Sequence, residues 1–426
     1  MKFVRKITVE VYPVTRSFTE LPGQAQDGNP GYPMARTAGC PLDPPPGLRT
    51  LESEGPLRRV RLWDGSTPWL VTRHAEQRAL LADRRVSSDP TRDGFPYLNS
   101  LVRERRNVGL SFISMDDPEH ARLRRMVTGA FTMRRIEGMR PGIQRVVDAL
   151  IDEMLAGQAP ADLVAAFALP VPSIVICHLL GVPYADHDFF QRTSRTLINR
   201  NTPAEVAQDA REELVAYLDR LIEGKLAEPG DDLLSRVAAE RVATGEMSRR
   251  ELVNMGLLLL IAGHETTANM ISLGTFALLT HPDQLAAVRG SDDPQLIVHT
   301  VEELLRYLTI VHTGRRRVAI EDIEIAGEVI RAGEGIVLPG EIANRDAAVF
   351  PDPDRLDVHR DARGHLAFGF GIHQCLGQPL ARAELQVVYG TLYRRVPTLA
   401  LAVDPARVPF KHDSIVYGVY ELPVTW

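Results

Sequence analysis

The chain has 426 residues, of which 44% are hydrophobic and 24% charged, so it can bury a large core and is neither disordered, collagen-like nor a disulfide scaffold. It carries 49 Lys and Arg residues against 55 Asp and Glu residues, a formal net charge of −6, and therefore no overall positive field that would hold nucleic acid. The cysteines Cys40, Cys177 and Cys375 are too few for a disulfide framework and fit a reducing cytoplasm.

The N-terminal region predicts neither export nor a membrane span. Charges interrupt the apolar residues of MKFVRKITVEVYPV, so no signal-peptide core forms, and we expect a cytoplasmic protein. Residues 1–50 are rich in Pro and Gly and are predicted to form an extended leader. The longest apolar stretch lies between Met255 and Gly263, far short of the roughly 20 residues that cross a bilayer.

Residues 51–426 are predicted to form one domain, mainly α with a smaller β-rich lobe. Short β-prone runs occur near residues 55–75 and again near 315–340. Helical periodicity dominates residues 119–299, and its longest segment, residues 250–280, is expected to be a central helix. A loop rich in Asp, Pro and Arg follows the second β-prone region, and helix returns after it.

A cysteine stands on a glycine-rich loop in HLAFGFGIHQCLGQPL. Gly369 and Gly371 precede Cys375, Gly377 follows it, and a helix is predicted next. A thiol at the start of a helix is favoured as a thiolate, which suits an iron ligand. A buried structural cysteine is the simpler alternative. A dinucleotide-binding loop is excluded because the third glycine is missing, and zinc because no other cysteine lies at ligand spacing.

Polar residues interrupt the apolar central helix in LLIAGHETTANM. Glu265 and Thr266 lie among apolar residues, where an uncompensated carboxylate would be costly, so a role in proton transfer is one interpretation. The alternatives are a threonine hydroxyl bonded to its own helix and a glutamate that reaches the surface. A zinc protease motif is excluded because Ala268 stands where the second histidine must be.

Two further motifs carry charge at helical spacing. In EELLR, Glu303 and Arg306 are three residues apart and can pair on one helix face, as many surface pairs do. In DDPEHARLRR, His120 and Arg124 lie one helical turn apart, and a solvated basic face is the alternative to a binding role.

FGFGIHQCLG resembles the haem-ligand loop of cytochrome P-450 monooxygenases, in which the cysteine is the proximal thiolate. LLIAGHETT is similar to the oxygen-binding segment of that family, and EELLR to its buried ExxR pair. The resemblance extends from about Cys40 to Trp426 and is to the soluble bacterial branch found in actinomycetes. It implies the P-450 fold, a triangular prism with the long central helix over haem b.

The resemblance also implies residue roles. Glu265 and Thr266 would relay protons to bound dioxygen, and Ala262 and Gly263 would leave room above the iron. Cys375 is the implied metal ligand. The implied cofactor contacts are His120, Arg124, Ala262, Gly263, Arg317, Phe368, Gly369, His373, Cys375 and Gly377.

The family's buried ion pair is implied for Glu303 and Arg306, completed by Arg355 of the segment Pro353-Asp354-Arg355. Leu356 stands where the family usually has phenylalanine, which puts the local packing in doubt.

The activity implied by the resemblance is insertion of one atom of O2 into a C–H bond of a lipophilic small molecule, a macrolide or another secondary metabolite. Electrons would come from NAD(P)H through ferredoxin reductase and ferredoxin, to a monomer that binds no nucleic acid. A basic stretch would face an acidic ferredoxin. This stretch comprises Arg122, Arg125, Arg134, Arg135 and Arg140. The implied substrate-facing positions are residues 89–110, 189–206, 259, 262, 309–312 and 415–417.

Other functions remain open at this point. A broad-specificity xenobiotic hydroxylase of the same family is the enzymatic alternative, and a haem-binding sensor is the non-enzymatic one. A peroxygenase would not need both Glu265 and Thr266. A haem-free helical binding protein would leave the coincidence of motifs unexplained.

Overall fold

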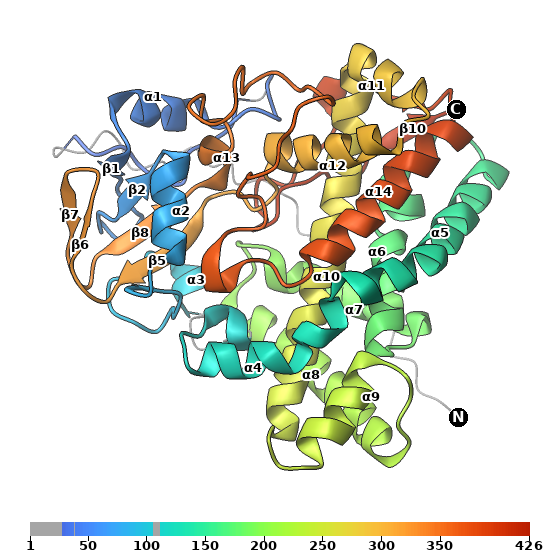
Figure 1. Ribbon diagram of the computed structural model, residues 1–426, viewed down its shortest axis with the longest axis horizontal. Coiled ribbons are helices and arrows are strands. Elements are labelled where there is room, and N and C mark those ends of the chain that lie inside the picture. Colours follow the sequence, from blue (N-terminus) through green and yellow to red (C-terminus); the bar gives the residue numbers. More distant parts are fainter. Residues whose placement is uncertain (1–27, 38, 105–110) are drawn as a thin grey trace.

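The computed structural model describes residues 28–37, 39–104 and 111–426. Most of the predicted leader and residues 105–110 of the predicted substrate-facing stretch lie outside the described residues. Helices form one side of the molecule and a smaller β-rich part the other (Figure 1), which confirms the predicted fold class. Within the described residues, no helix is long and apolar enough to cross a membrane.

The helices build the larger part of the structure. Their bounds are α1 Pro46–Glu54, α2 His74–Ala82, α3 Ser100–Glu104, α4 Glu119–Thr128, α5 Met133–Ala156, α6 Pro170–Leu180, α7 His187–Ile198, α8 Ala204–Ala227, α9 Leu233–Val237, α10 Arg249–Thr280, α11 Pro282–Arg289, α12 Pro294–Leu308, α13 Gly340–Ala343 and α14 Gln378–Arg395.

The strands are short, and most of them lie in the two regions predicted from the sequence. Their bounds are β1 Leu57–Arg59, β2 Trp69–Val71, β3 Val86–Ser87, β4 Ala161–Asp162, β5 Arg315–Ala319, β6 Ile323–Ile325, β7 Glu328–Ile330, β8 Gly335–Leu338, β9 Ala400–Leu401 and β10 Pro423–Thr425.

The two predicted β regions join in one five-stranded sheet of order β1-β2-β8-β5-β3. Strand β5 pairs antiparallel with β8, with Arg315 opposite Leu338 and Arg317 opposite Ile336. Because side chains alternate along a strand, Arg315 and Arg317 share one face and Arg316 lies on the other. Arg315 and Arg317 are therefore directed to one side of the sheet and Arg316 to the other.

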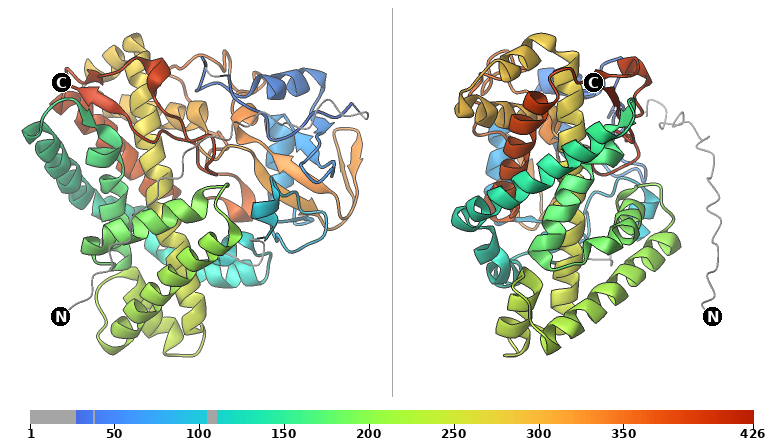
Figure 2. Two further views of the ribbon diagram at one scale, coloured as in Figure 1. Left: turned by 180° about the vertical axis from the view of Figure 1, so that it is seen from behind. Right: turned by 90° about the vertical axis from the view of Figure 1, so that its right-hand side faces the viewer.

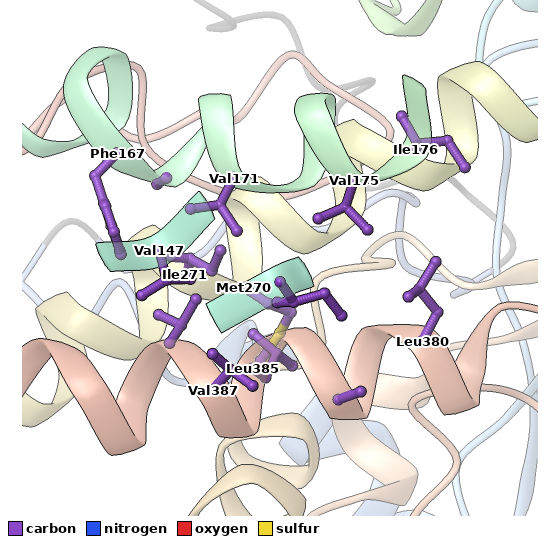
Figure 3. Packing of buried hydrophobic residues seen from close by; sticks show 14 of the residues in the cluster. Val147, Phe167, Val171, Val175, Ile176, Met270, Ile271, Leu380, Leu385 and Val387 are labelled. Carbon is purple, nitrogen blue, oxygen red and sulfur yellow. The ribbon is translucent and has the colours of Figure 1, made fainter. Parts of the chain in front are cut away.

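Helix α10 runs through the helical part of the molecule (Figure 2). It begins at a capping box in which the Ser248 hydroxyl accepts from the Glu251 backbone and the Glu251 carboxylate accepts from the Ser248 backbone. Its 32 residues span about 48 Å, and most are buried, as expected for a helix that is apolar on all sides. Side chains of α5, α6, α10 and α14 belong to one buried hydrophobic cluster. Figure 3 shows Val147, Ile176, Met270 and Leu385, one from each of these helices.

Candidate active site

The loop before α14 holds Cys375 in a fixed backbone. The Cys375 N–H donates to the Phe368 carbonyl at 2.8 Å. Gly371 has φ +71°, and a Cβ on it would overlap the backbone oxygen of Leu81, so only glycine fits there. Burial raises the pKa of the Cys375 thiol, which a hydrogen bond from the Gly377 backbone and the charges of nearby arginines lower in part. Solvent still reaches the cysteine side chain.

Ala262 is the exposed residue of α10 between residues 251 and 280, where every other position is buried or half-buried. A helix in the middle of a core exposes one alanine only where the packing leaves space beside it. Gly263, its neighbour, was also predicted to clear space, and the structure shows that it has a packing role as well. A Cβ on Gly263 would lie 2.6 Å from Ile176 of α6, so this glycine allows the two helices to pack closely.

Glu265 and Thr266 follow Ala262 by one helical turn. The Thr266 hydroxyl donates to the Ala262 carbonyl at 2.7 Å, the back-bond considered as the alternative. Because its proton is held there, the Thr266 oxygen offers lone pairs, and it accepts more readily than it donates. Glu265 is only 3% exposed, so it does not reach the surface.

Buried groups surround Glu265. The His264 Nδ1 lies 2.7 Å from the Leu260 carbonyl, and burial lowers the pKa of His264, which keeps the ring neutral. Lys411 donates to the Asn269 side chain at 3.0 Å. Burial lowers the pKa of Lys411, and the Glu265 carboxylate acts against that shift. Lys411 is far away in sequence, so no local motif could have indicated it.

Histidines and arginines with few acidic partners lie beside the cysteine loop. Arg124 donates to the Gln374 carbonyl at 2.6 Å, directly before Cys375. The His373 Nε2 lies 3.0 Å from the Ser88 hydroxyl, and the rings of His120 and His373 are 4.2 Å apart. The structure therefore brings together residues of α4 and of the cysteine loop that the sequence singled out separately.

Burial is the leading influence on the charges of this group. It lowers the pKa of Arg317 to about 10 and that of His373 to about 3, and it also lowers the pKa of Arg124 and His120. The protein therefore offers few opposite charges to stabilise the charged forms of these arginines and histidines. The His120 Nε2 is buried without a hydrogen-bond partner among the described residues.

Arg315 is a site residue that the sequence reasoning missed. Its Nη2 donates to the Ala367 carbonyl at 2.7 Å, and its Nη1 is buried without a partner in the described part of the chain. It lies against Gly369, and its charge acts on Cys375. The two-residue spacing from Arg317 on β5 was the signal that could have identified it.

This arrangement fits haem b. Haem b carries two carboxylates, which need cationic or N–H donors, and the structure offers buried donors that the protein leaves unpaired. The exposed thiol of Cys375 supplies a soft ligand of the type that binds haem iron. Among the described residues, no cluster of His, Cys, Asp or Glu could hold a separate metal ion.

A second charge cluster is formed by Glu303 and Arg306, and its charged groups find their hydrogen-bond partners within the protein. Arg306 donates from Nε and Nη2 to Glu303 at 2.7 and 2.8 Å, and from Nη1 to the Asn344 and Pro353 carbonyls, both at 2.8 Å. Glu303 and Arg306 are both 0% exposed. The pair is therefore buried and structural, and not a surface pair.

The prediction that Arg355 completes this pair is wrong. The Arg355 side chain is exposed, and only its carbonyl oxygen faces Arg306. The second cation on Glu303 is Arg360, whose Nε lies 3.2 Å from the Glu303 Oε1. Leu356 is only 2% exposed, so a leucine packs well where a phenylalanine was expected.

Phe368, the remaining predicted contact, packs against Arg382 of α14, which in turn binds Glu302 of α12. The Arg382 guanidinium lies 4.6 Å from the centre of the Phe368 ring. Arg382 also binds Glu302 with distances of 2.6 and 3.0 Å, and His365 lies 3.2 Å from the same carboxylate. This bridge fixes the position of the loop that leads to the cysteine.

The predicted basic stretch is partly neutralised. Arg122 pairs with Glu119 and Glu251, and Arg140 pairs with Glu137. The exposed cations that remain are Arg125, Arg134 and Arg135.

Comparison with known proteins identifies the family. A family model described as Cytochrome P450 matches residues 58–291 and 292–399. The chain is 58% identical to cytochrome P450 GfsF of Streptomyces halstedii over 95% of this chain and 98% of that protein, and the GfsF crystal structure superposes with a TM-score of 0.87 over 93% of this chain and all of that one.

A second solved relative is the mycinamicin VIII C21 methyl hydroxylase of Micromonospora griseorubida, bound to mycinamicin VIII. It is 43% identical, with a TM-score of 0.88 over 93% of this chain and all of that one. Pentalenic acid synthase of Streptomyces avermitilis is 53% identical over 95% of this chain and 99% of that protein. The chain therefore belongs to the cytochrome P450 family and is a cytochrome P450 monooxygenase.

Proposed function

We propose that this monooxygenase hydroxylates a lipophilic secondary metabolite, such as a macrolide, in a pocket between α10 and the cysteine loop. The observation that carries the proposal is the solvent-accessible Cys375 thiol set among buried donors that the protein leaves unpaired. It is supported by relatives whose names state hydroxylation of a mycinamicin methyl group and synthesis of pentalenic acid.

In this proposal the cofactor is haem b, which supplies dioxygen activation when bound. Cys375 would bind the iron through its thiolate, and the Gly377 N–H would hold that sulfur in place. The unpaired Nη1 of Arg315 would donate to the haem carboxylates, together with Arg124 and Arg317, and the His120 Nε2 would do so when that ring is protonated. These carboxylates would supply the negative charge that the buried cations lack.

The polar groups of α10 would hold and move the protons that the reaction needs. Thr266, whose proton is held by the Ala262 carbonyl, would offer its oxygen as a hydrogen-bond acceptor beside Ala262. Glu265 would hold the proton to be transferred, and Lys411 lies close enough for the two charges to interact.

Electrons would come from NAD(P)H through a ferredoxin reductase and an acidic ferredoxin. The exposed Arg125, Arg134 and Arg135 support this electron supply, because they lie on or next to α4, the helix that contacts the cysteine loop through Arg124. An electrostatic docking step predicts that reduction slows as salt rises, since screening weakens charge steering.

The first experiment is the absorption spectrum of the dithionite-reduced protein with carbon monoxide. A long-wavelength Soret band is expected for the wild type and should be lost in Cys375→Ser, while the matched control Cys40→Ser, at an exposed cysteine far from the loop, retains it. Loss of the band in both variants or in neither would remove the ligand assignment.

The substrate class is tested by turnover with purified ferredoxin and reductase. Macrolactones and other lipophilic metabolites are screened for spin-state shifts, and each ligand that shifts the spectrum is incubated with NADPH and analysed by mass spectrometry. A product heavier by one oxygen atom is expected for a secondary metabolite. Oxidation of unrelated foreign compounds alone, with no metabolite turned over, would point to a xenobiotic hydroxylase.

A further inference from the structure

Segments that the sequence assigned to substrate contact meet at one place in the fold. Arg200, after α7, donates from its backbone N–H to the Asp413 carbonyl at 2.9 Å and accepts at its own carbonyl from the Asn99 side chain at 3.3 Å. The Tyr417 N–H donates to the Ile310 carbonyl at 2.7 Å. The region before α3, the end of α7, the loop after α12 and the C-terminal loop are thereby joined.

Arg200 is buried at this junction. Its residue is 9% exposed, one guanidinium nitrogen donates to the His412 carbonyl, and its Nε is buried without a partner in the described part of the chain. Burial lowers its pKa, and the nearby charge of Asp413 offsets this only in part. A buried guanidinium with an unused donor is poised to bind an acceptor from outside the protein.

Arg316 approaches the same junction from β5. It lies on the opposite face of the strand from Arg315 and Arg317, so it is directed away from the cofactor pocket. Its guanidinium is 5.9 Å from the Phe95 ring, and burial lowers its pKa. The groups whose charges act on it are Tyr32, Tyr97 and Arg200, and none of these is a carboxylate.

Tyr32 completes the cluster. It is 5% exposed, and its hydroxyl is buried with no hydrogen-bond partner among the described residues. The charges that act on it are those of Glu341, Arg200, Arg316 and Arg36. Glu341 is the one carboxylate in this set, and Arg36 is the leading cation acting on it, so these two offset each other. Arg200 and Arg316 then remain, and Asp413 offsets the charge of Arg200 only in part.

We propose that Tyr32, Arg200 and Arg316 form a binding site for a carboxylate carried by the lipophilic substrate. This inference rests on the proposed function and narrows its substrate class to amphipathic acids. The unpaired Arg200 Nε, the Tyr32 hydroxyl and the Arg316 guanidinium provide donors from three separate segments. Because Arg316 and Arg315 lie on opposite faces of β5, this site is separate from the residues that would hold the cofactor carboxylates.

The test compares two probes of equal chain length, dodecanoate and methyl dodecanoate, by calorimetric and spin-state titration of the haem-loaded enzyme. The wild type is expected to bind the carboxylate at least about tenfold more tightly than the ester, since charge-assisted pairing with arginine is lost in the ester. Arg316→Gln and Arg200→Gln should each remove most of that preference and leave ester binding unchanged.

The matched control is Arg220→Gln, which removes the same charge from an exposed position on α8, outside the segments assigned to substrate contact, and should keep the full preference. Equal binding of the two probes by the wild type, no binding of either, or an unchanged preference in both cluster variants would overturn the inference. Competition by acetate or phosphate as strong as that by dodecanoate would also overturn it, because the site would then bind free anions rather than an amphipathic acid.

The carbon monoxide spectrum separates this inference from the proposed function. A variant that keeps the thiolate Soret band but loses the carboxylate preference supports the anion site. A wild type with the band and turnover of neutral metabolites, but no carboxylate preference, overturns the anion site and leaves the proposed function intact. Absence of the band in the wild type would count against the proposed function.

Discussion

Two buried charge clusters of this protein both contain arginines and reach opposite states. In the first, Arg306 has hydrogen-bond acceptors for Nε, Nη1 and Nη2, and its carboxylate partner Glu303 also binds Arg360. In the second, beside Cys375, Arg315 and His120 keep buried nitrogens that no described residue satisfies. A closed cluster contributes to the fold, whereas an open one destabilises the protein until a ligand of opposite charge enters.

The largest change in stability is expected when the Glu303–Arg306 cluster loses one of its charges. Arg306→Met leaves the Glu303 carboxylate with Arg360 alone in a site with no solvent access, and should reduce the free energy of unfolding by about 3 to 5 kcal/mol. Denaturant unfolding measures this. The control is Arg363→Gln, which removes an exposed pair with Asp361 and should leave stability unchanged. A loss as small as that of the control would show that the pair is not structural.

In the cluster beside Cys375, removal of a cation is expected to increase the free energy of unfolding. Arg317→Leu removes a cation whose pKa burial lowers to about 10, and should raise the free energy of unfolding of the haem-free protein by about 1 to 2 kcal/mol. The same variant should lose haem faster, because a donor to its carboxylates is missing. Unfolding of the apoprotein and haem transfer to apomyoglobin measure the two effects. A variant that weakens both would assign Arg317 to the fold instead.

The pH dependence of stability at Glu302 provides a further test of how buried charges act in this protein. Burial raises its pKa, but hydrogen bonds from His365 and Arg382 outweigh burial and lower it to about 2. Because the folded pKa lies below the ordinary value of 4.5, the stabilisation is present above about pH 4.5 and is lost as pH falls toward 2. Glu302→Gln should therefore be less stable by about 1 to 2 kcal/mol at pH 7, and the difference should shrink on acidification. A difference independent of pH would contradict the charge assignment.

The smallest effect on stability is expected at Thr266. Its hydroxyl donates only to the Ala262 carbonyl, so Thr266→Ala should cost less than about 1 kcal/mol. In turnover, however, the variant should consume NADPH and release hydrogen peroxide with little product, whereas Thr266→Ser should restore coupling. The ratio of product to NADPH measures this. Unchanged coupling in the alanine variant would remove the proposed role of the hydroxyl.

The sequence by itself predicted the features that are local along the chain. The glycine spacing around Cys375, the long apolar run of α10 and the three-residue spacing of Glu303 and Arg306 each follow from backbone geometry within a few residues. These features predicted the mainly helical fold and the family. Short-range geometry is enough for them because a turn or a helix face is defined by its own residues.

Only the tertiary structure decided which distant groups meet. It replaced Arg355 by Arg360 in the buried ion pair, gave Gly263 a role in helix packing, and placed Arg315 beside the loop that carries Cys375. It also joined Arg200 to Asn99 and Asp413, each more than a hundred residues away in sequence. The order of charges along a chain does not specify which of them share a low-dielectric interior, because that depends on how strands and helices from separate regions pack.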